Sequence, residues 1–215
     1  MRSALSLKFL PILVLLAVSA CKAEKVEIKI TPDDIISAAD GKPVMVEFET
    51  TVGEKYTKID DEKRSTIKSV ETMIVKYFPD AEVEVEFGSD EYSITITGEI
   101  AVANAEPKEG APWYVTATKI TPEGGIFVSL QPSSSFDAFD AELQGINLML
   151  GPDKFQPVTF KVKGDKGRIT AGGVYVDGVP STLAFIDLKG ERVSLLFDEG
   201  VWTKTAGGFL FDLTH

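Results

Sequence analysis

The side chains that most often perform catalysis are scarce in this chain. His215 is the only histidine and the last residue, and Cys21 is the only cysteine. Serine–histidine catalysis and Cys/His zinc sites would both need His215, and terminal residues tend to be poorly ordered. The segment Gly164–Gly167 lacks the spacing of a phosphate-binding P-loop. We therefore expect a non-catalytic protein that needs no cofactor and has no metal site.

Carboxylates are the remaining groups that could do chemistry. Two sets lie close together in sequence, one on a predicted strand and one on a predicted short helix. They are Glu82, Glu84 and Glu86, and Asp137, Asp140 and Glu142. Either set could bind a hard cation such as Ca²⁺, but neither has EF-hand spacing, and a solvated face is the commoner role in an acidic protein. Carboxylates distant in sequence leave a glycan hydrolase as an alternative.

A third set of side chains could bind a partner through charge or aromatic surface. The candidates are Trp113, Phe136, Phe139, Lys161, Lys163, Lys166 and Arg168. The four basic residues lie across a predicted hairpin, where they could contact lipid or lipopolysaccharide phosphates or form its solvated side. Aromatic anchors often dominate interfaces. Phe136 and Phe139 share helical spacing with Leu143, however, which favours core packing.

The first residues have the pattern of a secretory signal peptide. Arg2 and Lys8 precede an uncharged stretch, Phe9–Cys21, of 13 residues. A membrane-spanning helix needs about 20 apolar residues, so this stretch is too short to be one. A basic start, a short apolar region and small residues at its end are typical of a cleaved signal.

The end of this stretch, Val18-Ser19-Ala20-Cys21, resembles a lipobox, the site that lipoprotein signal peptidase recognises. All four positions match the motif. The resemblance implies cleavage before Cys21 and attachment to the membrane through acyl chains on that cysteine. An ordinary signal peptide with an accidental cysteine is the alternative, but an unpaired thiol is unusual in an exported protein.

The residue after the cysteine bears on localisation. In Gram-negative lipoproteins an aspartate at this position usually retains the protein at the inner membrane, and here it is Lys22. The resemblance therefore implies the outer membrane, with the body facing the periplasm, if the host is Gram-negative.

Composition limits the partners of the mature body. Without Arg2 and Lys8 the chain has 20 basic and 33 acidic side chains, a net charge of −13. An acidic body argues against nucleic acid and against broad attraction to anionic lipid. A hydrophobic content of 44% is that of a globular protein.

Periodicity predicts a mixture of strands and helices. Thr31 should cap a short helix after a first strand, and the stripe from Ile67 to Phe78 predicts a longer one. Val83–Phe87 and Tyr92–Ile96 alternate cleanly, which indicates a hairpin with one packed face. Further strands are expected at Trp113–Ile120, Ile126–Gln131, Pro157–Lys163, Arg168–Val176, Leu183–Leu188, Arg192–Phe197 and Phe209–Leu213.

These elements predict an α+β fold, with mainly antiparallel sheet and two or three helices packed on one face. Val44–Phe48 and Ile126–Leu130 each follow an Ile-Thr-Pro triplet and precede a helix, which suggests two β-α-β-β repeats. The expected division is a signal peptide at 1–20, a lipid-anchored tether at 21–24, an α+β unit at 25–103, a linker at 104–112 and a β-rich α+β unit at 113–215.

The body opens with Lys25–Asp34, which resembles small bacterial and phage lipoproteins of unknown function. That resemblance implies no activity and no functional residues. We expect a non-catalytic, lipid-anchored envelope lipoprotein that binds another envelope component; a phage-encoded version would suggest superinfection exclusion. The alternatives are a carboxylate-dependent glycan hydrolase and a carrier of a small apolar ligand. An exposed apolar patch would favour binding, and a concave aromatic pocket would favour the carrier.

Overall fold

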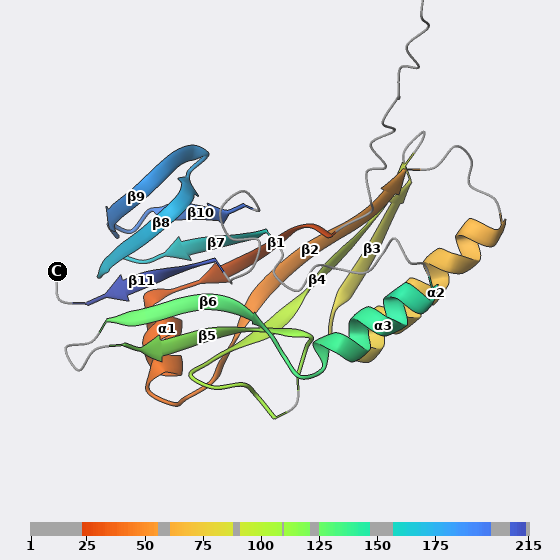
Figure 1. Cartoon of the computed structure of the whole chain (residues 1–215), viewed down its shortest axis with the longest axis horizontal. Helices are drawn as coiled ribbons and strands as arrows, with labels where there is room; N and C mark the ends of the chain where they lie inside the picture. The colour runs from red at the N-terminus through yellow and green to blue at the C-terminus, as the bar shows by residue number, and fades with distance from the viewer. Residues whose placement is uncertain are drawn as a thin grey trace, which may run out of the picture.

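A computed structural model describes residues 23–55, 61–87, 91–108, 110–120, 125–146, 157–198 and 207–213 (Figure 1). Cys21, the predicted signal peptide and His215 lie outside these residues. The helices are α1 (Pro32–Ala39), α2 (Asp61–Tyr77) and α3 (Phe136–Ile146). The strands are β1 (Ala23–Ile30), β2 (Val44–Lys55), β3 (Glu82–Phe87), β4 (Glu91–Ala103), β5 (Trp113–Lys119), β6 (Ile126–Pro132), β7 (Val158–Lys163), β8 (Arg168–Val176), β9 (Val179–Asp187), β10 (Arg192–Phe197) and β11 (Gly208–Asp212).

All of these strands belong to one sheet that closes on itself. Nine of them follow the order β10-β7-β1-β2-β4-β5-β6-β11-β8, and β8 pairs with β10 through Val176 and Leu195 to complete a barrel. The pairs β1–β7 and β4–β5 are parallel, and the others are antiparallel. The two remaining strands branch from the barrel, β3 from β4 and β9 from β8.

The prediction of an α+β fold, with two or three helices packed on one face of mainly antiparallel sheet and with two β-α-β-β repeats, is wrong: the structure is a closed barrel. Alternation indicates a strand with one packed and one solvated face, and this is equally the pattern of a strand in a closed barrel. Closure depends on pairings between residues far apart in sequence, such as Val26 with Val158. Strands of the predicted units 25–103 and 113–215 share this one sheet, since β1 of the first unit pairs with β7 of the second and β4 pairs with β5. The domain division itself stays a prediction.

Large apolar side chains fill the interior of the barrel. Phe48, Phe160, Phe209 and Phe211 are each at most 1% exposed. The rings of Phe160 and Phe209 meet edge to face, with their centroids 5.3 Å apart. Because these side chains come from strands on different sides of the barrel, they form a packed core.

The helices cover the ends and flank of this core. α1 follows the end of β1, with Ile35 fully buried, and α2 and α3 lie together beside β3 (Figure 1). The predicted cap of α1 is confirmed: Asp34 N–H donates to Thr31 Oγ1 at 3.3 Å, and Thr31 N–H donates to Asp34 Oδ2 at 2.9 Å. The helix predicted from the Ile67–Phe78 stripe and the β3–β4 hairpin are also confirmed.

Candidate functional site

Two strands of the described chain pair on one side only, and their sequences differ in charge. β3 carries Glu82, Glu84 and Glu86, all exposed. Charged side chains are a common way of preventing an edge strand from pairing with another chain. β9 has no charged residue from Val179 to Ile186. The one residue of β9 that would hinder the addition of another strand is Pro180, near the start of β9, because proline has no N–H group to donate. As far as the described residues show, the edge of β9 is therefore open to pairing over Ser181–Ile186.

The outer side of β9 continues an apolar surface across three neighbouring strands. Phe127 of β6 pairs with Leu210 of β11, Leu210 pairs with Thr170 of β8, and Thr170 pairs with Phe185 of β9. Phe185 is 65% exposed and Leu183 is 57% exposed, whereas Ala184 between them is buried. We call Phe127, Leu210, Thr170, Leu183 and Phe185 the β9 surface.

Two glycines contribute no side chain to this surface, so at their positions the surface is formed by the backbone itself. Gly172 lies opposite Leu183, and Gly208 lies opposite Ser129. A Cβ atom on Gly208 would be 2.8 Å from Phe127 Cζ and 2.5 Å from the Val128 carbonyl oxygen. The Phe127 ring thus lies close against bare backbone, which makes the surface shallow.

A charged row borders the β9 surface. Arg168 lies opposite both Asp187 and Asp212, and its Nε donates to Asp187 Oδ1 at 2.7 Å. The hydrogen bond to Asp187 raises the pKa of the Arg168 guanidinium, so this group stays charged. The apolar part of the β9 surface ends at this charged row. Protein interfaces are arranged in the same way, with an apolar centre and a polar rim.

Three of the four basic candidate residues form ion pairs in the structure. Lys161 pairs with Glu27, Lys166 with Asp33, and Arg168 with Asp187. Lys163 is exposed at the end of β7. Pairing with carboxylates offsets most of the positive charge that would attract phosphate groups, so the hairpin is not strongly basic.

The aromatic candidates lie in the core. Trp113, Phe136 and Phe139 are each 3% exposed. The Trp113 ring lies edge to face with both phenylalanines, at centroid distances of 5.4 and 5.6 Å. Phe136 and Phe139 thus have the packing role that their helical spacing favoured. The exposed apolar residues Leu183 and Phe185 were not among the candidates, although the polar Thr182 and the small Ala184 beside them are visible in the sequence.

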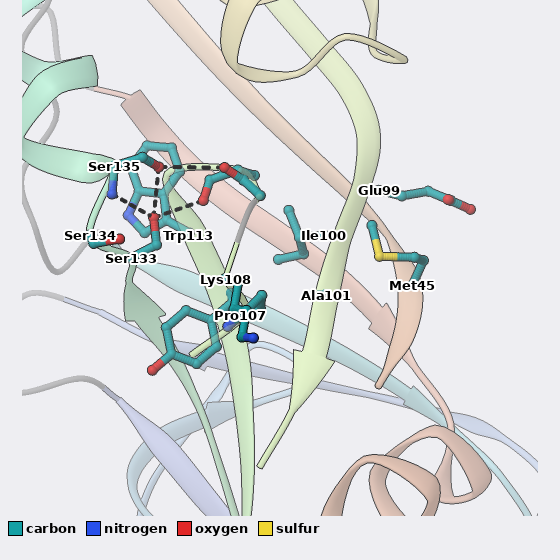
Figure 2. Close-up of a pocket in the computed structure, with 13 residues that line it drawn as sticks. Met45, Glu99, Ile100, Ala101, Pro107, Lys108, Trp113, Ser133, Ser134 and Ser135 are labelled. Carbon is teal, nitrogen blue, oxygen red and sulfur yellow. Dashed lines mark hydrogen bonds between the residues drawn. The ribbon is translucent and has the colours of Figure 1, made fainter. Parts of the chain in front are cut away.

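A small pocket lies beside Trp113 (Figure 2). Its volume is about 120 Å³, and its lining includes Met45, Ile100, Trp113, Tyr114 and Ser133. Pockets for small-molecule ligands usually have about 300–1,000 Å³. Ser133 Oγ donates to the carbonyl of Ala111 at 2.8 Å, while the buried Trp113 Nε1 has no hydrogen-bond partner within the described part of the chain. The indole nitrogen is buried, so the polar groups of the lining come from Glu99, Lys108, Tyr114 and Ser133–Ser135 instead.

The carboxylate clusters also have structural contacts. Glu142 of α3 accepts a hydrogen bond from Tyr77 Oη of α2 at 2.9 Å and pairs with Lys76. Asp140 accepts from Gln144 on the same helix. Over the described residues, no group of three or more His, Cys, Asp or Glu side chains is placed to hold a metal ion.

The described residues contain no helix that is long and apolar enough to cross a bilayer. Comparison with protein-family models and with curated proteins finds no match to this chain.

Proposed function

We propose that this protein is a lipid-anchored envelope lipoprotein that binds an extended segment of another envelope protein along β9. In this proposal Cys21 carries the acyl chains, the body faces the periplasm from the outer membrane, and the protein acts by binding. The observation that supports it best is the strand β9, which is uncharged from Val179 to Ile186 and has one edge unpaired among the described residues. Its side chains Leu183 and Phe185 are more than half exposed.

The contrast between the two edge strands of the described chain strengthens the proposal. An extended segment could add to Ser181–Ile186 through main-chain hydrogen bonds, while its side chains contact Leu183, Phe185 and the rest of the β9 surface. The three glutamates of β3 would oppose the same mode of binding at the other edge. The packed barrel interior gives less support to the alternative of a carrier that holds its ligand inside the barrel.

Site-specific photocrosslinking in living cells tests this proposal. Benzoylphenylalanine replaces Phe185 in one strain and Val75 in the control strain. Val75 is also about half exposed, at 49%, but it lies on α2. We expect one adduct with an envelope protein from position 185 and none from position 75. Equal adducts from both positions, or an adduct with a second copy of this chain, would contradict the proposal.

The double variant Leu183→Ser/Phe185→Ser tests the same surface without crosslinking. Truncating central interface side chains commonly costs a tenfold or greater loss of affinity, so recovery of the partner should fall about tenfold or more. Both side chains are exposed, so the free energy of unfolding should change by no more than about 0.5 kcal/mol for each. Unchanged recovery of the partner by a folded variant would contradict the proposal.

A further inference from the structure

One end of the barrel lies within reach of the predicted lipid. β1 begins at Ala23, two residues after Cys21. A chain spans at most about 3.6 Å per residue, so the Cys21 Cα lies within about 7 Å of the Ala23 Cα. If Cys21 is acylated, there is no tether long enough to let this end of the barrel move away from the bilayer.

The strand register identifies which residues share this end. Ala23 pairs with Val52 of β2, Val52 with Ile94 of β4, and Ile94 with Val85 of β3. Phe87 lies two residues beyond Val85, or about 7 Å further along the strand direction. Along the strand direction, Phe87 therefore lies about 7 Å beyond the row that contains Ala23, which is the greatest distance that Cys21 can also reach. Across the sheet, Phe87 lies three strand spacings, or about 14 Å, from β1.

The side chains at this position suit the boundary between water and lipid. Phe87 is 49% exposed. The guanidinium carbon of Arg64, in the first turns of α2, lies 5.7 Å from the centroid of the Phe87 ring. An aromatic ring can enter the headgroup region, while the guanidinium donates hydrogen bonds to lipid phosphates.

We infer that Phe87 and Arg64 form a second membrane contact that fixes the orientation of the barrel on the bilayer. This inference rests on the proposed acylation of Cys21. Asp61, Glu62 and Glu86 lie at the same end, so attraction to anionic lipid does not drive the contact. The anchor supplies the affinity, because it makes the binding of Phe87 an intramolecular event with a high effective concentration of lipid.

A fluorescent reporter in the acylated protein tests the inference. Acylation uses the thiol of Cys21, so Glu86→Cys introduces a single reactive thiol beside Phe87, which stays intact. Ile120→Cys is the matched control, since Ile120 is 56% exposed and follows β5 at the opposite end of the barrel. Each protein is labelled with an environment-sensitive dye and reconstituted in vesicles of phosphatidylethanolamine and phosphatidylglycerol that contain a nitroxide-labelled lipid.

We expect a blue shift and nitroxide quenching of the dye at position 86 but not at position 120. Adding Phe87→Ser or Arg64→Gln should reduce the quenching at position 86. Equal quenching at the two positions, or quenching at 86 that neither substitution changes, would overturn the inference. Mass spectrometry of the same samples separates this failure from failure of the anchor: a chain with unmodified Cys21 would overturn both, whereas an acylated chain without quenching at 86 would overturn only the orientation.

Discussion

At the scale of single residues, Glu142 joins two helices that are far apart in sequence. Its carboxylate accepts a hydrogen bond from Tyr77 and pairs with Lys76. Lys76 and Tyr77 together hold the pKa of Glu142 below its usual range. The hydrogen bond to Glu142 also raises the pKa of Lys76. The pKa of Tyr77 is raised mainly by burial of its hydroxyl group and secondly by its hydrogen bond to the Glu142 carboxylate. One exposed carboxylate therefore connects α3 to the end of α2.

Replacing this carboxylate should have a pH-dependent effect. Because the pKa of Glu142 is lower in the folded than in the unfolded protein, its contribution to stability is present above the unfolded-state pKa of about 4.3. The contribution is lost as the pH falls through the folded-state pKa. We expect Glu142→Gln to lower the urea midpoint slightly at pH 7, and the gap from wild type to close under more acidic conditions. A gap that widens on acidification would contradict this assignment.

At the scale of elements, α1 depends on its first turn. The helix has only eight residues, and short helices are marginal without a cap and tertiary packing. Thr31 and Asp34 satisfy each other's backbone N–H groups in a capping box. Ile35 and Ala38 then bury one face of the helix against the barrel.

Thr31→Ala removes this cap and should cost about 1 kcal/mol of unfolding free energy. Ser37→Ala is the control, since it removes a hydroxyl from the interior of the same helix, where alanine is the better helix former. Urea unfolding of both variants checks the prediction. A Thr31→Ala variant as stable as Ser37→Ala would show that the capping box contributes little.

Elements such as α1 could be predicted from the sequence because their signals are local. The cap, the stripe of α2 and the β3–β4 hairpin each depend on residues a few positions apart. Sheet order could not be predicted in this way: β1 pairs with β7, more than a hundred positions later, and alternation alone does not select a partner. The β9 surface could not be predicted for a related reason. Leu183 and Phe185 alternate just as core-facing residues do, and only the position of β9 at an edge shows that they face solvent.

At the scale of the whole molecule, stability depends on the filling of the barrel. Phe160 is fully buried and contacts the rings of Phe197 and Phe209. We expect Phe160→Ala to cost about 3–5 kcal/mol, since the surrounding strands cannot collapse fully into the space. Phe185→Ala, which truncates a ring that is 65% exposed, should change stability by no more than about 0.5 kcal/mol. Denaturant unfolding that gives equal losses would contradict a packed barrel interior.

The two proposed contacts lie at opposite ends of the molecule. Phe185 lies two residues along β9 from Asp187, which is opposite Arg168 at one end of the barrel. The strand β1 finishes at the same end. Phe87 lies at the end where β1 begins. Figure 1 shows this separation along the long axis, with β9 at one side of the picture and the tip of β3 at the other. A barrel held at its Phe87 end would direct the β9 surface away from the lipid.

The position of β11 constrains the order in which the barrel can close, and this constraint would apply during the proposed export. It comes after every other described strand in the chain, yet it lies between β6 and β8 in the sheet. A chain that crosses a membrane from its N-terminus delivers Ala23 before Gly208–Asp212. Until those residues arrive, β6 and β8 each keep an unpaired edge, the kind of surface on which strands from different molecules associate. Closure of the barrel therefore requires Gly208–Asp212, and in the proposed export it would wait until these residues have crossed the membrane.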